Sequence, residues 1–172
     1  VVPVEQSGFY KKLLILDSML YAYDTNMKFF RLNSKIGQML QTGTVPGSFN
    51  QDFPAFDALP PAIFLRSNNL YYSPNEGQTW TLWPETDIAG QSLLFKDFVA
   101  SEAGFYGLNQ FPAQIYFAEE PGDPFVRLAF PPMDTLSQPN LNAVVAIEYV
   151  NGYLYAVQSS GAIFRRKVDK QA

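Results

Sequence analysis

The stretch LYYSPNEGQTW at residues 70–80 decides the fold, because three more stretches of the chain align with it without a gap. These are LYAYDTNMKFF at 20–30, IYFAEEPGDPF at 115–125 and LYAVQSSGAIF at 154–164. Every copy begins with an aliphatic residue and a tyrosine and ends on an aromatic residue. Three copies have glycine at the eighth position, where the first has Met27. The copies start 50, 45 and 39 residues apart, a period typical of propeller blades.

An apolar run and a short polar turn precede each copy. The run at 144–150, for example, is followed by Asn151 and Gly152, and Asn-Gly between two apolar runs is the strongest short hairpin signal. Each unit is therefore predicted to hold three consecutive strands, the second of which carries the tyrosine. The first strands are expected at 12–16, 62–65, 104–108 and 144–150, and the third strands at 28–32, 79–83, 124–130 and 163–168.

A four-stranded blade needs one more strand, which we expect before each triplet, at 1–4, 36–42, 93–99 and within 136–144. The Pro- and Gly-rich segments 43–61 and 131–142 are expected to be loops between blades, and a short helix is conceivable around 34–40. We therefore predict an all-β protein with a single domain over 1–172, a β-propeller of four units at approximately 1–33, 34–85, 86–131 and 132–172. It is either a closed four-bladed ring, with adjacent termini, or part of a larger propeller.

Composition excludes several classes of function. The 172 residues include no cysteine and no histidine, which removes disulfides, thiolate catalysis, zinc–thiolate sites and the usual general base. A metal would need oxygen ligands, which leaves calcium or magnesium, and no cofactor is predicted. The net charge of −4 and the lack of long basic runs argue against nucleic-acid binding. No apolar run approaches the roughly 20 residues that span a bilayer.

Residues 73–80, SPNEGQTW, resemble the Asp-box or BNR repeat, whose pattern is S-x-D-x-G-x-T-W. Ser73, Gly77, Thr79 and Trp80 match the pattern, and Asn75 stands where the family usually has aspartate. In the family the box is a turn between the third and fourth strands of a blade. A short Asp or Asn side chain can accept backbone N–H groups within such a turn, and glycine supplies a positive φ. These five residues are therefore expected to be structural.

The resemblance implies a propeller fold rather than one activity, because Asp-boxes occur in sialidases, sortilin-like receptors, photosystem assembly factors and uncharacterised secreted bacterial proteins. It also implies a bacterial protein that works outside the cytoplasm, either secreted, periplasmic or at the cell surface. A sialidase-like enzyme would need an arginine cluster, a tyrosine nucleophile with a glutamate partner, and an acidic general acid. The arginine motif F/Y-R-I-P of that family is missing here.

The arginines are predicted to protect sheet edges rather than to form a carboxylate clamp. Four of them follow the aromatic end of a copy by one or two residues, which places them on outermost strands: Arg31, Arg127, Arg165 and Arg166. Arg66 alone lies on a segment that could face a central cleft.

The densest acidic group, Glu119, Glu120 and Asp123, lies in the turn of the third copy. We expect a solvated turn there, with a calcium site as the alternative. Glu148 alternates with apolar neighbours on a predicted strand, and we expect it at an exposed position rather than in a central channel.

Ligand residues tend to differ from blade to blade, so the repeated tyrosines are predicted to pack between sheets. Residues that break the repeat are better candidates for a ligand surface, because exposed aromatic rings stack on sugars or anchor partner proteins. The candidates are Trp83, Tyr72, Arg66, and Phe53 and Phe56 of an aromatic-rich loop, which could instead plug a blade edge. The predicted function is a non-catalytic, monomeric binding or scaffolding module for a glycan or protein. The alternative is a sialidase-like glycoside hydrolase domain or fragment.

Overall fold

The computed structural model of the chain describes residues 10–16, 18–33, 35–47, 55–59, 61–110, 113–128 and 144–168. All regular structure in these residues is β-strand, which confirms the all-β prediction. Within the same ranges, no helix is long and apolar enough to cross a membrane. The chain divides into two compact units, Val1–Leu82 and Trp83–Ala172, which we describe separately.

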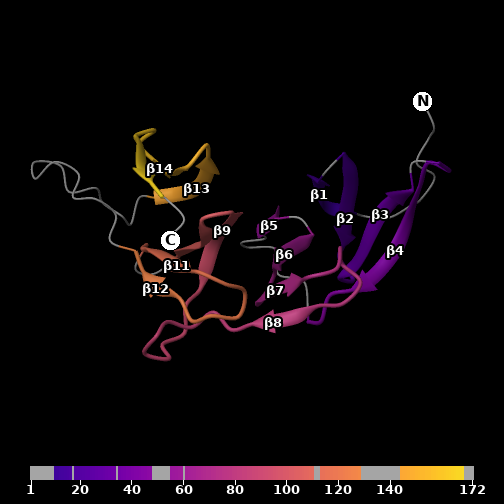
Figure 1. Cartoon of the computed structure of the whole chain (residues 1–172), viewed down its shortest axis with the longest axis horizontal. Coiled ribbons are helices and arrows are strands. Elements are labelled where there is room, and N and C mark those ends of the chain that lie inside the picture. The colour runs from indigo at the N-terminus through magenta and orange to yellow at the C-terminus, as the bar shows by residue number, and fades with distance from the viewer. Residues whose placement is uncertain are drawn as a thin grey trace, which may run out of the picture. The chain divides into compact units, whose positions relative to one another are not determined.

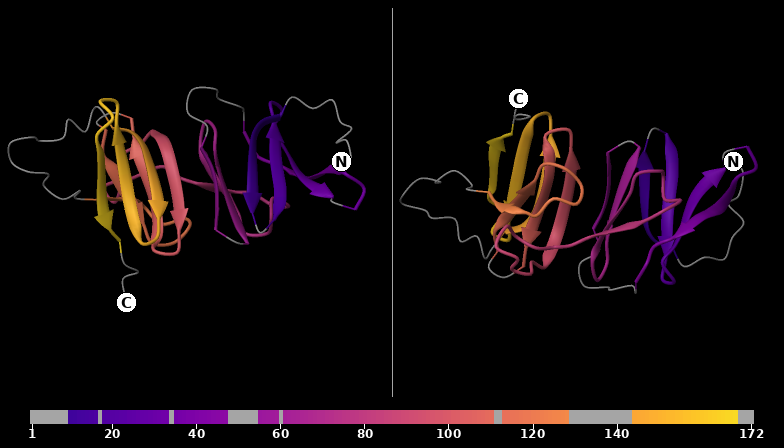
Figure 2. Two further views of the ribbon diagram at one scale, coloured as in Figure 1. Left: turned by 90° about the horizontal axis from the view of Figure 1, so that it is seen from above. Right: turned by 60° about the horizontal axis from the view of Figure 1, so that its bottom comes forward.

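The first unit holds two four-stranded sheets whose strands follow one another in chain order (Figures 1 and 2). The first sheet consists of β1 (Tyr10–Leu16), β2 (Met19–Asp24), β3 (Lys28–Asn33) and β4 (Gln38–Thr44). The second sheet consists of β5 (Ala55–Leu59), β6 (Ala62–Arg66), β7 (Leu70–Ser73) and β8 (Thr81–Trp83), whose last residue belongs to the second unit.

The second unit holds the other two sheets, again in chain order. One consists of β9 (Phe95–Ser101), β10 (Gly104–Asn109), β11 (Ile115–Ala118) and the short β12 (Val126–Arg127). The other consists of β13 (Val144–Val150), β14 (Tyr153–Gln158) and β15 (Ile163–Lys167). The predicted Asn151-Gly152 turn joins β13 to β14, and both of its residues have positive φ.

The four copies of the repeat share a backbone feature at their eighth position. Gly77, Gly122 and Gly161 have φ values of +85°, +101° and +86°, and Met27 has φ +60°. A methionine in the left-handed region is unusual, because its Cβ crowds the backbone there. The turn of the first copy therefore keeps its shape without glycine, and the buried side chain of Met27 joins the core.

The copies do not occupy the same strands of their sheets. The tyrosine-bearing strand is β2, the second of four strands, in the first copy, and β14, the second of the three described strands, in the fourth copy. It is the third strand in the second and third copies, where it is β7 and β11. The extra strand expected before each triplet would put the tyrosine on the third strand of every sheet. The second and third copies agree with this, and the first is wrong by one strand, because neighbouring hairpins of a meander have the same local pattern.

Strand placement shows where the additional strand of the first three sheets comes from. The strand expected at 36–42 exists as β4, but it pairs with β3 and completes the first sheet instead of opening the second. β5 opens the second sheet, and β9 opens the third as expected. A helix around 34–40 is wrong, since a turn and β4 occupy the described part of that segment. Residues 1–4 and most of 136–144 lie outside the described residues, and ring closure and the single-domain boundaries stay predictions.

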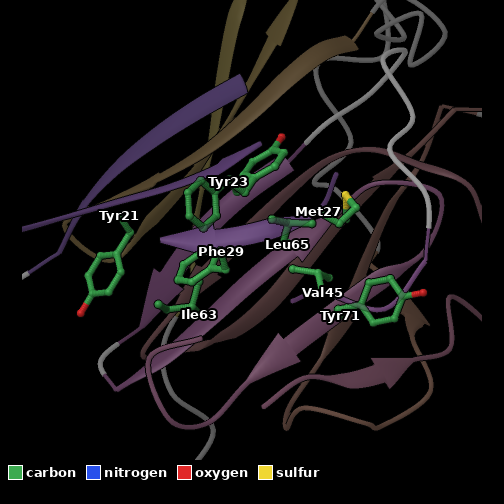
Figure 3. Close-up of a cluster of buried hydrophobic side chains, with 9 residues drawn as sticks. Tyr21, Tyr23, Met27, Phe29, Val45, Ile63, Leu65 and Tyr71 are labelled. Atoms are coloured by element: carbon green, nitrogen blue, oxygen red, sulfur yellow. The ribbon is translucent and has the colours of Figure 1, made fainter. Parts of the chain in front are cut away.

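The core of the first unit lies between its two sheets. Tyr21 and Phe29 stack with ring centroids 5.8 Å apart, and Phe56 meets Phe29 edge-on at the same distance. Figure 3 shows Tyr21, Tyr23 and Phe29 of the first sheet beside Ile63 and Leu65 of the second. The buried cluster consists of Tyr21, Tyr23, Met27, Phe29, Val45, Phe56, Ile63, Leu65 and Tyr71.

The second unit has two buried groups. One lies between its sheets and includes Val99, Tyr106, Leu108, Ile115, Val144, Ile147, Leu154 and Ala156. The other is aromatic and surrounds Trp83, which stacks on Phe125 at 5.0 Å and meets Phe98 and Phe105 edge-on. Burial of apolar rings on this scale is the main stabilising term of the unit.

The aromatic residues of the repeat are buried to different extents. Tyr21, Tyr71, Tyr116 and Phe125 are buried, whereas Tyr155, Phe30, Trp80 and Phe164 are half-buried. None of these eight side chains is exposed, in agreement with a packing role.

Candidate binding site

A hollow of about 420 Å³ lies on the first sheet of the first unit. Strands β2, β3 and β4 and the turn between β3 and β4 supply its walls. Its volume lies within the range of roughly 300–1,000 Å³ that is usual for small-molecule sites. The lining residues are Met19, Arg31, Leu32, Asn33, Lys35, Leu40 and Thr42.

A tight turn after β3 places the polar residues at one end of this hollow. The Asn33 carbonyl accepts the N–H of Gly37 at 2.8 Å, and its side-chain oxygen accepts the N–H of Lys35 at 3.1 Å. Gly37 has φ +66°, a conformation that glycine adopts without steric cost. An Asx-type turn of this kind holds the backbone of Lys35 against the end of the strand.

Arg31 links the hollow to the turn of the second sheet. Its Nη1 donates to Oε2 of Glu76 at 2.8 Å. The two side chains are 42% and 40% exposed, and an ion pair that solvent reaches this well contributes only about 0–1 kcal/mol to stability. The pair can therefore exchange with another carboxylate at little cost.

The lining of the hollow combines two cations with apolar and uncharged polar groups. Arg31 and Lys35 supply the positive charge, and none of the described residues that line the hollow is acidic. Proton transfer or nucleophilic attack would need a carboxylate, imidazole or thiolate among the walls. The lining can instead bind a ligand that carries negative charge next to an apolar group.

The turn at 73–80 has the hydrogen bonds that the sequence predicts for a structural turn. The side-chain oxygen of Asn75 accepts the Thr79 N–H at 2.9 Å and the Thr79 hydroxyl at 3.2 Å. Ser73 Oγ accepts the Gly77 N–H at 2.8 Å, and the indole N–H of Trp80 donates to the Gly77 carbonyl at 3.0 Å. All five predicted residues therefore take part in one turn between the third and fourth strands of its sheet.

The candidate ligand residues do not form one surface. Trp83 and Phe56 are buried in the cores of the two units, with 0% and 8% exposure, so the expectation that they are exposed platforms is wrong. Arg66 is buried on β6, and Tyr72 is half-buried on β7. Phe53 lies outside the described residues. The lining of the large hollow includes none of them.

The arginines are spread over different strands. Arg127 lies on β12 and Arg165 and Arg166 on β15, which are edge strands as predicted. Arg31 is an exception, because β4 covers its strand and makes it the third of four. The second unit has a smaller hollow of about 170 Å³ that Arg166 lines with Tyr106. Neither of the two hollows has more than one arginine in its lining.

The remaining titratable candidates show no catalytic arrangement in the described residues. Burial raises the pKa of Tyr23 and of Tyr106 to about 12, which keeps both phenols protonated and makes them poor nucleophiles. The acidic turn with Glu119, Glu120 and Asp123 is exposed. Across the described ranges, no group of three acidic side chains is close enough to hold a metal ion. Glu148 is exposed on β13, as expected.

Sequence reasoning did not find the hollow. Arg31 was expected on an outermost strand, and Asn33, Lys35, Leu40 and Thr42 have no motif that marks them. The signal that could have located it is the pairing of 38–44 with β3, because this pairing brings the two walls together. Periodicity predicts that a strand exists, but it does not identify the neighbour of that strand.

Comparisons with known proteins identify similar folds but no sequence relative. No protein-family model matches the sequence, and no curated protein is similar to it. The computationally designed Ika4 protein aligns with a TM-score of 0.63 and 9% identity over 97% of this chain and 96% of Ika4. The β-propeller domain of Cps50 (Swd1) from Myceliophteria thermophila aligns with a TM-score of 0.61 and 10% identity, over 98% of this chain and 58% of that one.

BamB from Moraxella catarrhalis aligns with a TM-score of 0.58 and 11% identity, over 91% of this chain and 44% of that one. The chain thus spans about half the length of these two natural propellers. At such low identity the likeness concerns the fold alone. It supports the prediction made from the repeat: this is an all-β chain of the β-propeller type, with four sheets.

Proposed function

We propose that this protein is a non-catalytic binding or scaffolding module, and that the hollow formed by β2, β3 and β4 is its ligand site. The observation that carries the proposal is the lining itself. Among the described residues, it combines Arg31 and Lys35 with apolar side chains and includes no acidic residue. The ligand is a glycan or a protein, as the sequence suggests.

The wider setting is also a proposal. The hydrogen bonds of Asn75 and Ser73 support an Asp-box identity for 73–80. That resemblance in turn supports a bacterial protein that works outside the cytoplasm.

A glycoside hydrolase is the weaker alternative. It would need several arginines in one pocket beside an activated tyrosine and a carboxylate. The two hollows have one arginine each, and the two buried tyrosines have raised pKa values. We therefore favour binding over catalysis.

The test uses a variant that places a charge in the hollow. Leu40 is 43% exposed and lines the hollow, so Leu40→Asp should leave the fold intact while repelling the ligand. Leu94→Asp is the matched control, because Leu94 is 46% exposed and lies elsewhere. Wild type and both variants are screened against an oligosaccharide array and an array of immobilised peptides. We expect hits that Leu40→Asp loses and Leu94→Asp keeps, and equal loss or equal retention would contradict the site.

A further inference from the structure

We propose that β4 binds an extended acidic segment of a partner protein, which adds to the first sheet as a fifth strand and places a carboxylate in the hollow. This inference rests on the proposed function and names the class of ligand. The open edge of β4 and the positive charge beside it are separate observations that lead to the same ligand.

The first observation is the edge itself. β4 is the last strand of its sheet, and no described strand pairs with its outer side (Figure 1). An edge strand presents unpaired N–H and C=O groups that can template another strand, and proteins usually protect it with charges or proline. β4 has the sequence QMLQTGT, with neither a charged residue nor a proline.

The other described edge strands are protected differently. β8 is only three residues long and is followed by Pro84. Each of the rest has at least one charged residue: Lys11 in β1, Asp57 in β5, Lys96 in β9, Arg127 in β12, Glu148 in β13 and Arg165 in β15. Among the described strands, β4 is therefore the one long edge without this protection.

A bulge limits the pairing surface to the first part of β4. Phe29 of β3 pairs with Gly43 of β4, and the next residue, Phe30, pairs with Gln41. The register therefore shifts at this point, and Thr42 has no partner in it. The Gln41 side chain also donates to the Gly43 carbonyl at 3.3 Å. Residues 38–41 precede this irregularity, and their length suits a short extended peptide.

The second observation is the charge beside this edge. Leu40 is paired with Arg31 across the two strands, so both side chains lie on the same face. An added strand would lie about 4.8 Å beyond β4, and its side chains on that face would be next to Leu40 and the hollow. Arg31 and Lys35 would attract a glutamate or aspartate there, whereas a basic side chain would be repelled.

The ion pair with Glu76 shows the chemistry that this position accepts. A carboxylate already contacts Arg31 Nη1 at 2.8 Å, and the planar guanidinium is well suited to carboxylates. Because the pair is exposed, a carboxylate from a ligand can replace that of Glu76. Removing the carboxylate of Glu76, which competes for Arg31, should therefore strengthen binding of an acidic peptide.

The probes are three capped peptides, Val-Glu-Val-Glu-Val, Val-Lys-Val-Lys-Val and Val-Glu-Pro-Glu-Val, titrated into the full chain by calorimetry. We expect the first to bind, with an affinity that falls as salt rises. The lysine peptide should not bind because of its charge, nor should the proline peptide, which lacks a ladder donor. Amide hydrogen exchange should show new protection at residues 38–42.

Variants of charged residues test the role of charge separately from the addition of a strand to β4. Arg31→Met and Lys35→Met should each weaken binding of the acidic peptide about twofold to fivefold, the range expected when one solvent-exposed ion pair is lost. Glu76→Gln should strengthen it about twofold to fivefold. Arg127→Met is the matched control, because it removes an exposed arginine from another edge strand. It should change affinity by less than about twofold.

Several outcomes would overturn the inference. Equal binding of the acidic and lysine peptides would show that charge does not select the ligand. Protection at β15 instead of β4 would show that the peptide binds at another edge. Protection of 38–42 that rises with protein concentration without peptide would show that a second copy occupies the edge. If no peptide binds but a glycan is lost in Leu40→Asp, the proposed function stands and this inference fails.

Discussion

Replacing Gly77 with alanine tests whether the turn at 73–80 is packed against the first sheet as the structure shows. Gly77 has φ +85°, and a Cβ added to it would lie 2.1 Å from Phe29 Cδ1. The Phe29 ring is fully buried and cannot yield easily, because Tyr21 stacks on it and Trp80 meets it edge-on at 5.1 Å. Gly77→Ala therefore combines a conformational cost with a steric clash.

The two costs can be separated in magnitude. Alanine in the left-handed region costs about 1–2 kcal/mol, and forcing extra volume into a packed core costs typically about 1–3 kcal/mol. Gly77→Ala should therefore lower the free energy of unfolding by about 2–5 kcal/mol. This is a large share of the roughly 5–15 kcal/mol that stabilises an ordinary domain.

Gly161→Ala is the matched control. Gly161 has φ +86°, close to that of Gly77, but no atom lies within 4 Å of the position of its Cβ. This variant should lose only the conformational part, about 1–2 kcal/mol. Urea denaturation followed by circular dichroism gives the free energies, and hydrogen exchange assigns each loss to its own unit.

A double variant decides whether Phe29 causes the difference. In a Phe29→Leu background the ring is gone, so adding Gly77→Ala should cost no more than Gly161→Ala costs alone. Equal losses for Gly77→Ala and Gly161→Ala in the wild-type background would refute the packing of this turn on Phe29.

Four further predictions follow from other contacts. Stability to urea should fall as pH rises from about 10 to 12. In the unfolded chain the tyrosines ionise near their ordinary pKa of 10.0, whereas in the folded protein Tyr23 and Tyr106 keep their protons up to about pH 12. A Tyr23→Phe/Tyr106→Phe variant should show a smaller loss of stability over the same pH range. Asn75→Ala should cost about 1 kcal/mol in thermal denaturation by losing the bonds to Thr79, whereas Asn75→Asp should be nearly neutral. Asp97→Ala should destabilise the second unit by about 1–3 kcal/mol, because the N–H of Ile147 loses its partner at 2.8 Å. No turnover of a fluorogenic sialoside is expected, and product release above the blank would contradict the binding role.

The sequence by itself was sufficient for the fold class and for the turn at 73–80. Both depend on local chemistry. Asn75 accepts a hydrogen bond from Thr79, only four residues away, and Gly77 lies in the same turn. Their spacing in the sequence therefore predicts both the hydrogen bond and the positive φ. The alternation of apolar runs with Asn-Gly and other polar turns likewise predicts strands joined in chain order, and the sheets have that order.

Tertiary structure alone decided which strands belong to which sheet, and thereby the candidate site. Residues 38–44 form a strand whether they open the second sheet or close the first, and neither periodicity nor turn chemistry distinguishes the two. Their pairing with β3 places Leu40 beside Arg31, buries Met39 and makes β4 the last described strand of its sheet. The sequence also did not decide whether Trp83 and Phe56 are buried, because an aromatic residue can pack in a core or contact a ligand at the surface. Such choices depend on contacts between residues far apart in the chain, and local sequence patterns do not encode which of those contacts form.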